Sequence, residues 1–235
     1  MLVGWIDPSA SAVTAAALPA LSVVIAAFII AAACNSTNLI DGMDGLCAGV
    51  VLISAVGFAA VTGALVAKGA IESTGAMLII TIAAAAAGAC SAFLLFNFNP
   101  ASMFMGDSGS LLLGFSVATT LVLLAELAGW RGLIAGAIAF GFPFFDTALA
   151  VGRRWLNTKP LFTGDRSHFY DQIRDRGYSV KQTVVGCYGL QFAFAATGVV
   201  CAIVPMWSVV CIAAGLPIAG WLVCRRFGLL RIERP

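Results

Sequence analysis

The chain has 235 residues, of which 61% are hydrophobic and 10% charged, and its mean hydropathy is +1.00 with a formal net charge of +2. This composition excludes a water-soluble domain with an ordinary polar exterior. Nothing in the sequence indicates nucleic-acid binding, because the basic residues border apolar runs rather than forming a solvated patch with stacking aromatics. We therefore predict a polytopic membrane protein whose residues 1–235 form a single membrane-embedded domain.

Apolar runs long enough to cross about 30 Å of hydrocarbon recur along the chain. In lipid every backbone amide must find its hydrogen bond within its own segment, so these runs are predicted as helices. The fold class is therefore an all-α transmembrane helix bundle. About seven spans are expected, at residues 12–34, 46–67, 74–96, 110–128, 132–151, 183–204 and 206–224.

Basic residues fix the expected orientation of the bundle. The loops 35–45, 97–109 and 152–182 and the tail 225–235 should share one side, leaving only Lys68 and Arg131 on the other. The shared side then carries eleven of the 13 Lys and Arg residues, at positions 153, 154, 159, 166, 174, 176, 181, 225, 226, 231 and 234. This positive-inside pattern predicts a multi-pass protein of the inner (plasma) membrane with that side in the cytoplasm.

The first polar motif follows the first span. Four polar side chains recur in it every three residues: Asn35, Asn38, Asp41 and Asp44. No Lys or Arg is interleaved, and a bare carboxylate at bilayer depth costs about 2.5–3.5 kcal/mol on insertion scales. Two carboxylates near a helix end can hold Mg²⁺ together with substrate phosphate oxygens. The alternative is a capped helix start, with Asp44 as the N-cap of the 46–67 span.

The second polar motif lies between the spans at 74–96 and 110–128. Pro100 breaks the helix there, and Gly106 and Gly109 flank Asp107. Glycine lets a phosphate approach the backbone, and the following helix start offers free N–H groups to an anion. Phe104 either stacks on a nucleobase or plugs the bundle. Both polar motifs are expected to open to the cytoplasm.

A third element places Asp146 inside the span at 132–151, ahead of Arg153 and Arg154. Either arginine could reach toward Asp146 or toward a pyrophosphate, and an arginine pair at a span end is also a common topology signal. The next loop contains His168, the single histidine of the chain. Its residues 165–176 are predicted to form a short interfacial helix.

These motifs resemble one known family. The matching patterns are N-x-x-N-L-x-D-G-x-D-G-L at 35–46, F-N-x-x-P-A-x-x-F-M-G-D-x-G-S-L at 96–111, P-x-x-D-T at 143–147 with Arg154, and D-R-x-H at 165–168. Together they resemble the polyprenyl-phosphate N-acetylhexosamine-1-phosphate transferases, of the glycosyltransferase 4 type, which are related to phospho-N-acetylmuramoyl-pentapeptide transferase. The similarity runs from about residue 20 to 182.

The resemblance implies transfer of a sugar-1-phosphate from a UDP-N-acetylhexosamine to a polyprenyl phosphate in the cytoplasmic leaflet, with release of UMP. It also implies Mg²⁺ as cofactor, with Mn²⁺ as a substitute, and membrane lipids and a second copy of the chain as further partners. Asp107 matches the metal ligand, and Asp41 and Asp44 match catalytic positions. The substrate-binding positions matched are Asn38, Asn97, Phe104, Gly106, Arg154 and His168.

Two departures from the family pattern shape these expectations. The histidine cluster of the family reads His168-Phe169-Tyr170-Asp171 here, which argues against the muramoyl-pentapeptide branch and leaves the sugar open. Family members also carry earlier spans with an Asp-Asp-rich motif, so we expect an N-terminally truncated homologue. The alternatives are an inactive remnant, or an ion-coupled transporter that binds Na⁺ or H⁺ at Asp41, Asp44, Asp107 and Asp146.

Overall fold

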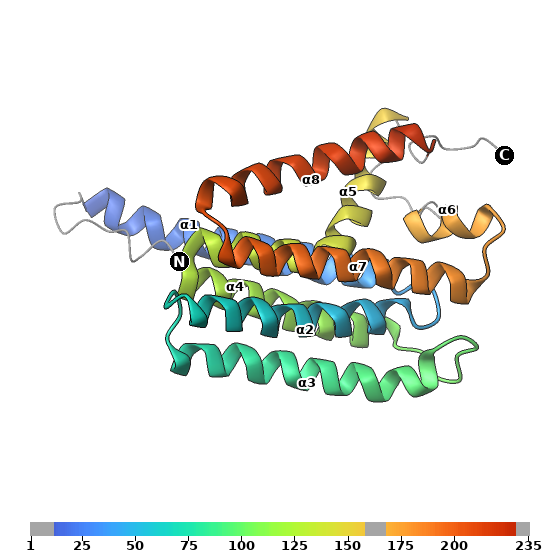
Figure 1. The fold of residues 1–235 in the computed structure, drawn as a ribbon, viewed down its shortest axis with the longest axis horizontal. Helices are drawn as coiled ribbons and strands as arrows, with labels where there is room; N and C mark the ends of the chain where they lie inside the picture. The colour runs from blue at the N-terminus through green and yellow to red at the C-terminus, as the bar shows by residue number, and fades with distance from the viewer. Residues whose placement is uncertain (1–11, 158–167, 229–235) are drawn as a thin grey trace.

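A computed structural model describes residues 12–157 and 168–228, and over these residues every regular element is a helix (Figure 1). The elements are α1 (Ala12–Leu39), α2 (Leu46–Ala67), α3 (Ser73–Asn97), α4 (Gly106–Ala139), α5 (Gly141–Leu156), α6 (Phe169–Asp175), α7 (Val180–Ile203) and α8 (Met206–Arg226). Within the described residues, 6 helices are long and apolar enough to cross a membrane. The prediction of an all-α polytopic membrane protein is confirmed.

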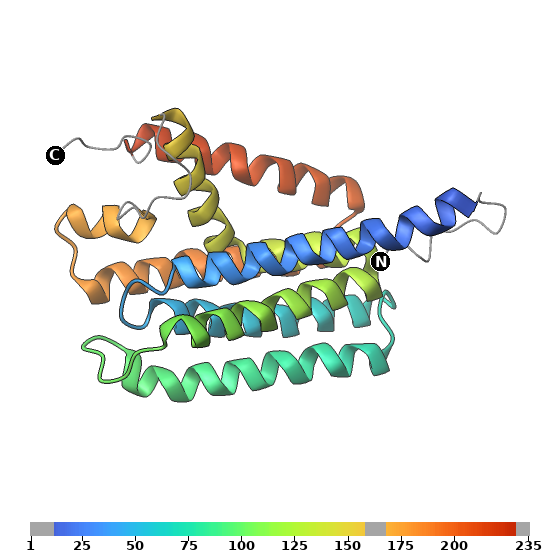
Figure 2. The ribbon, with the colours of Figure 1, turned by 180° about the vertical axis from the view of Figure 1, so that it is seen from behind.

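The long helices pack side by side into a bundle with α2 at its centre (Figures 1 and 2). Half of the α2 span is buried inside the protein, more than of any other span. Small residues let the helices approach closely, as expected where lipid supplies no hydrophobic driving force between them. A Cβ added to Gly114 of α4 would lie 2.5 Å from the Cα of Cys34 in α1.

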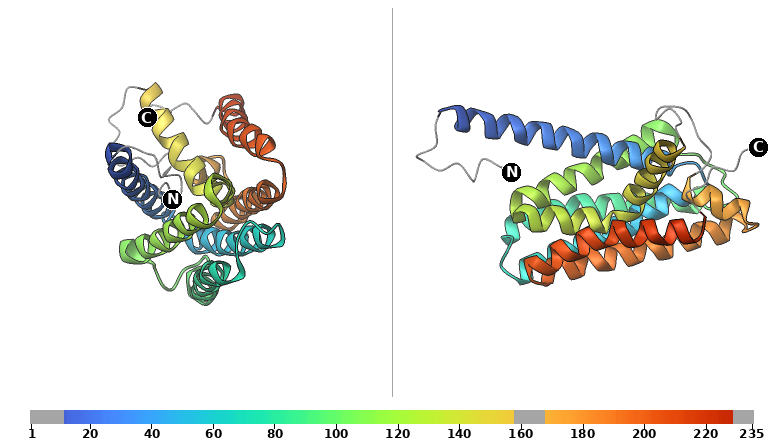
Figure 3. Two further views of the ribbon diagram at one scale, coloured as in Figure 1. Left: turned by 90° about the vertical axis from the view of Figure 1, so that its left-hand side faces the viewer. Right: turned by 90° about the horizontal axis from the view of Figure 1, so that it is seen from above.

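The predicted span at 132–151 is divided between two helices. The chain bends at Gly129, where φ is 60° and ψ is −148°. It then packs back on itself, because a Cβ on Gly132 would lie 2.1 Å from the carbonyl oxygen of Leu124. The helix breaks again at Phe140, and α5 leaves the bundle at a steep angle to the other helices (Figures 1 and 3). The count of about seven spans therefore fits if this broken passage is included.

Gln191 of α7 stabilises the break between α4 and α5. Its side-chain Nε2 donates to the carbonyl oxygen of Ala139 at 2.7 Å and to the hydroxyl of Ser54 at 2.9 Å. Its Oε1 accepts from the backbone N–H of Phe142 at 3.2 Å. A buried glutamine thus satisfies backbone groups that a broken helix would otherwise leave unpaired in an apolar interior.

The α1–α2 turn, the α3–α4 loop and α6 gather at one end of the bundle, at the right of Figure 1. The α2–α3 and α7–α8 connections lie at the opposite end (Figure 2). The described parts of the loops that were expected to share a side therefore do so. Lys159 and Arg166 of the 152–182 loop, and Arg231 and Arg234 of the tail, lie outside the described residues.

Candidate active site

The two polar motifs are joined by hydrogen bonds at that end of the bundle. The Asn97 Oδ1 accepts from the backbone N–H of Gly45 at 3.0 Å, and its Nδ2 donates to the carbonyl oxygen of Met103 at 2.9 Å. The Asp44 Oδ2 accepts from Asn99 Nδ2 at 2.9 Å and from the N–H of Ala101 at 3.1 Å. The α1–α2 turn and the α3–α4 loop are thereby held as one unit.

Gly45 makes this junction sterically feasible. It precedes α2 with a φ of 81°, a left-handed conformation that costs an L side chain about 1–2 kcal/mol. A Cβ there would also lie 3.1 Å from the ring of Phe98. The residue that caps α2 is thus a glycine rather than Asp44, and no side chain makes the cap hydrogen bond. The capping interpretation of Asp44 is wrong because its carboxylate binds the neighbouring loop instead.

Asp41 and Asp107 face each other across the junction. The Asn38 Nδ2 donates to Asp107 Oδ1 at 3.2 Å and to the Ser110 hydroxyl at 2.9 Å, which ties the end of α1 to the start of α4. Burial, together with the negative charge of Asp107, raises the pKa of the Asp41 carboxyl to about 6. A cation between these carboxylates would favour the ionised form of Asp41.

Three polar cavities adjoin this junction, and all of them are lined by Gly42. A cavity of about 300 Å³ is lined by six of the predicted site residues: Asp41, Asp44, Asn97, Phe104, Gly106 and Asp107. A second, of about 490 Å³, brings in two more, Asn38 and His168. Arg154 lies in the last turn of α5 and lines none of the three. The sequence motifs therefore converge, with Arg154 as the exception.

Phe104 projects from the α3–α4 loop with 76% of its surface exposed, although it lines the smaller cavity. Its neighbour Met105 is the residue that packs against the core. The suggestion that Phe104 plugs the bundle is therefore wrong. An exposed aromatic face beside a polar cavity remains available to a planar ligand.

His168 is held at the other edge of the site. Its Nδ1 lies at hydrogen-bond distance, 2.7 Å, from Asp146 Oδ2, and the backbone N–H of Phe169 donates to Asp146 Oδ1 at 2.7 Å. Asp146, toward which the sequence suggested that Arg153 or Arg154 could reach, thus bonds to the start of α6. The observed helix Phe169–Asp175 is shorter than the predicted 165–176, and Asp165 and Arg166 of that prediction lie outside the described residues.

Tyr170 is a site residue that the motifs did not single out. Its hydroxyl donates to the carbonyl oxygen of Leu39 at 3.0 Å, and burial raises its pKa well above the usual range. A Cβ on Gly42 would lie 2.4 Å from that hydroxyl oxygen, so the turn needs glycine where α6 rests on it. One indication of this role was present in the sequence, because Tyr170 stands where the family pattern has a histidine.

The donor set suits magnesium rather than zinc. Among residues 12–157 and 168–228, no group of three or more His, Cys, Asp and Glu side chains is arranged to hold a metal ion alone. Mg²⁺ is commonly bound by one or two carboxylates, with phosphate oxygens and waters completing the shell. Asp41 and Asp107 fit that pattern, because they line one cavity large enough to admit phosphate groups.

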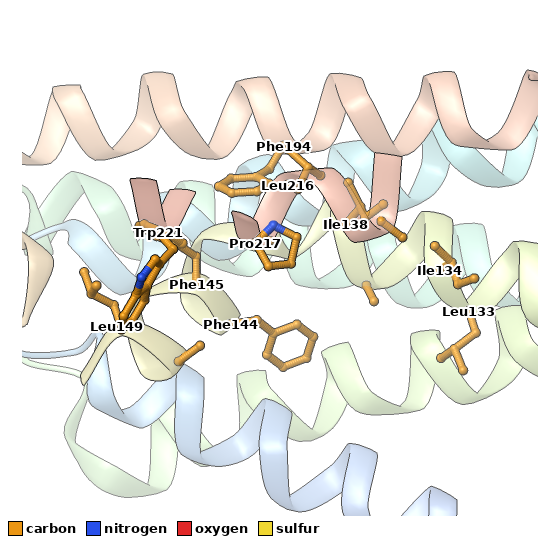
Figure 4. A pocket seen from close by; sticks show the side chains of 14 residues that line it. Leu133, Ile134, Ile138, Phe144, Phe145, Leu149, Phe194, Leu216, Pro217 and Trp221 are labelled. Carbon is orange, nitrogen blue, oxygen red and sulfur yellow. The ribbon is translucent and has the colours of Figure 1, made fainter. Parts of the chain in front are cut away.

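An apolar groove of about 500 Å³ lies beside this site (Figure 4). The second half of α4, together with α5, α7 and α8, forms its walls, and Phe144, Phe145, Phe194, Pro217 and Trp221 project into it. The ring of Phe145 lies 6.0 Å from that of Phe169, the residue after His168. The groove therefore reaches the same end of the bundle as the polar cavities.

The fold and the site define an all-helical membrane protein with an acidic cavity at one end of its bundle. Comparison with known proteins identifies the family within this class. The profile described as Glycosyl transferase family 4 matches residues 3–125, more than half of the chain. The chain belongs to this family.

Individual relatives agree with that assignment. The chain is 34% identical over 176 residues to the probable undecaprenyl-phosphate N-acetylglucosaminyl 1-phosphate transferase of Bacillus subtilis, covering 74% of this chain and 46% of that protein. It is 36% identical over 175 residues to the phospho-N-acetylmuramoyl-pentapeptide-transferase of Chlamydia muridarum, covering 74% and 49%. It is 31% identical over 171 residues to the decaprenyl-phosphate N-acetylglucosaminephosphotransferase of Mycobacterium tuberculosis, covering 66% and 41%. The chain thus spans about half the length of these relatives.

Proposed function

We propose that this protein transfers an N-acetylhexosamine-1-phosphate from a UDP-sugar to a polyprenyl phosphate at the cytoplasmic face of the membrane, releasing UMP. Such a reaction would initiate synthesis of a lipid-linked cell-envelope glycan. The observation that carries the proposal is the convergence of Asp41, Asp44 and Asp107 on one cavity at the end of the bundle. The names of the relatives, which act on prenyl phosphates and amino sugars, support it.

The bonds that form and break in this reaction determine what the site must do. A phosphate oxygen of the lipid forms a new bond to the sugar-linked phosphorus of the donor, and the bond from that phosphorus to the bridging oxygen breaks. UMP leaves with the bridging oxygen and its electron pair. Bringing two anions together is the main barrier, so neutralisation of charge and positioning are the main catalytic tools.

The residues of the smaller cavity divide this work. Phe104 would stack on the uracil ring, because its exposed face borders the cavity. Asn97 would shape the pocket rather than bind uridine through a free amide, since both ends of its amide already bond to the loops. Asn38 orients Asp107 through their hydrogen bond of 3.2 Å.

Asp107, with Asp41 opposite, would hold Mg²⁺, or Mn²⁺ in its place. The ion would neutralise negative charge on the diphosphate as the bridging bond breaks. Asp44 would keep the carboxylate pair in place through its bonds to the α3–α4 loop. Burial and the charge of Asp107 raise the pKa of Asp41, and a cation bound beside it would favour the ionised carboxylate.

The lipid acceptor would use the apolar groove of Figure 4. A prenyl chain needs an apolar surface that continues into the bilayer, while its phosphate must reach the polar cavities. The groove meets both needs, because Phe145 lines it and contacts Phe169 beside His168. The ion-coupled transporter has no comparable support, since three of its four carboxylates, Asp41, Asp44 and Asp107, lie at one end of the bundle rather than at its middle.

The test measures UMP release from UDP-N-acetylglucosamine and undecaprenyl phosphate by the chain in lipid nanodiscs with Mg²⁺. Asp107→Asn should lower the rate by about 100-fold or more, because it removes a metal-binding carboxylate. Glu72→Gln is the matched control, since it removes an exposed carboxylate at the opposite end of the bundle and should leave the rate within about two-fold. Absence of release by the wild-type chain would contradict the proposal and favour the inactive homologue.

A further inference from the structure

Asp146 is a fully buried carboxylate in α5, with 0% of its surface exposed, that lines none of the polar cavities. Both of its oxygens nevertheless accept hydrogen bonds from the start of α6. Oδ2 lies 2.7 Å from His168 Nδ1, and Oδ1 accepts from the N–H of Phe169 at 2.7 Å. A buried carboxylate requires such partners, because its desolvation is otherwise very costly. The choice of His168 as a partner is the informative feature.

The His168 ring is also fixed by its neighbours in α6. Tyr170 stacks on it with ring centroids 5.5 Å apart and planes 6° apart. The hydroxyl of Tyr170 donates to the carbonyl oxygen of Leu39, immediately before the acidic turn. The Asp171 Oδ2 accepts from the backbone N–H of His168 at 3.2 Å. The ring is therefore held relative to both α5 and the end of α1.

These contacts leave one ring nitrogen of His168 to interact with a ligand. An ionised carboxylate only accepts hydrogen bonds, so the contact with Asp146 requires a proton on His168 Nδ1. Nε2 is then the ring atom available to a ligand, as an acceptor when the ring is neutral and as a donor when it is charged. His168 lines the cavity of about 490 Å³ that it shares with Asn38 and Asp41.

We infer that Asp146 is a positioning residue, which fixes the orientation and tautomer of His168 so that Nε2 faces the diphosphate and sugar of the bound nucleotide sugar. This inference rests on the proposed function for the identity of the ligand. Asp146 acts through His168 and does not touch substrate. The arrangement is the one by which carboxylates orient metal-binding histidines, used here toward a polyanionic substrate.

Asp146→Asn separates this role from simple packing. An amide has the same shape but only one acceptor oxygen, whereas Asp146 accepts two hydrogen bonds. If its oxygen keeps the bond to Phe169, its NH₂ group faces Nδ1 and forces the proton of a neutral ring to Nε2. If it keeps the bond to Nδ1, the N–H of Phe169 loses its partner.

The control is Thr147→Val. Thr147 is the next residue in α5, and its hydroxyl donates to Ser36 Oγ at 2.9 Å, so the variant also removes one hydrogen bond between α5 and a neighbour. It does not touch His168. The expected result is a wild-type spectrum for His168 and a rate of UMP release within about two-fold of the wild type.

The first readout is the ring ¹⁵N spectrum of the chain labelled at histidine, in nanodiscs. His168 is the only histidine, so one spin system reports on it without assignment. The wild type should show a protonated Nδ1, and UDP-N-acetylglucosamine with Mg²⁺ should shift the Nε2 resonance. Asp146→Asn should change the Nδ1 resonance and abolish that ligand-induced shift. A neutral wild-type ring protonated at Nε2, or identical spectra for the two proteins, would overturn the inference.

The second readout is UMP release. Asp146→Asn should lower kcat by about 10–100-fold with little change in KM for the nucleotide sugar, the size found for outer partners of binding groups. In a His168→Gln background the same substitution should cost less than about two-fold, because the group it positions is gone. Independent, multiplicative losses would overturn the inference. Failure of the wild type to release UMP would instead contradict the proposed function, while the spectra still decide the role of Asp146.

Discussion

The side chains at this site are of two kinds: those whose polar atoms bond within the protein, and those that remain accessible to a ligand. Asn97 and Asp44 are of the first kind, because their polar atoms join the α1–α2 turn to the α3–α4 loop. Phe104 is of the second kind, since 76% of its surface is exposed at the cavity. The motifs contain both kinds side by side, so membership of a motif does not by itself define a contact with substrate.

Phe104→Leu should raise KM for the UDP-sugar by about 10-fold and leave the thermal stability unchanged. Base stacking on an aromatic ring contributes about 1–3 kcal/mol, and leucine offers no flat face. The variant is assayed by UMP release at varied nucleotide sugar. Phe28→Leu is the matched control, because Phe28 is 74% exposed on α1 and lines none of the three polar cavities. An unchanged KM for Phe104→Leu would remove the ring from the nucleotide-binding surface.

A site residue could be predicted where the neighbouring sequence marks it, and could not where its role depends on a residue far away along the chain. Asp41, Asp44 and Asp107 stood out because carboxylates are rare in apolar sequence, and the structure brings them to one cavity. Tyr170 was missed because its role depends on Leu39, 131 residues away along the chain. The bond of Asp146 to His168 was missed because the two residues are 22 positions apart along the chain, and only the fold brings them together.

At the scale of an element, the broken passage through α4 and α5 is what brings the site together. Hydropathy predicted one span at 132–151, because each half is apolar, although Pro143 has no N–H to donate to the carbonyl oxygen of Ala139 and so already indicates a break near Phe140. Gln191, a polar residue on another helix, supplies the missing backbone partners at the break. Periodicity within a segment carries no information about such a partner. The break turns α5 so that Asp146 meets the start of α6.

Gln191→Leu should therefore lower the free energy of unfolding by about 1–3 kcal/mol, since it leaves the carbonyl oxygen of Ala139 and the N–H of Phe142 unpaired in an apolar interior. Unfolding by SDS in mixed micelles measures the change. Thr197→Val on the same helix should alter stability by less than about 0.5 kcal/mol, because its hydroxyl bonds only to Ala193 of its own helix. Equal stability of the two variants would show that Gln191 does not support the break.

On the scale of the whole molecule, most of the described basic residues and the acidic cavity lie at the same end of the bundle. The described basic residues of α5, α6 and α8 lie at the end that carries the acidic cavity, and Lys68 and Arg131 lie toward the other. This asymmetry predicts that the cavity opens to the cytoplasm. Basic side chains at that end of the bundle, such as Arg174 at one of the cavities, would also attract a nucleotide diphosphate from that compartment.

Cysteine labelling tests this orientation directly. In a variant whose 7 native cysteines are replaced by alanine, Ser102→Cys marks the α3–α4 loop beside the cavity, and Ala70→Cys marks the α2–α3 connection at the opposite end. Both positions are exposed. A membrane-impermeant maleimide should label Ala70→Cys in intact spheroplasts and Ser102→Cys only in inverted vesicles. The reverse pattern would place the acidic cavity outside the cell, where a UDP-sugar donor is not supplied, and so would contradict the proposed reaction together with the orientation.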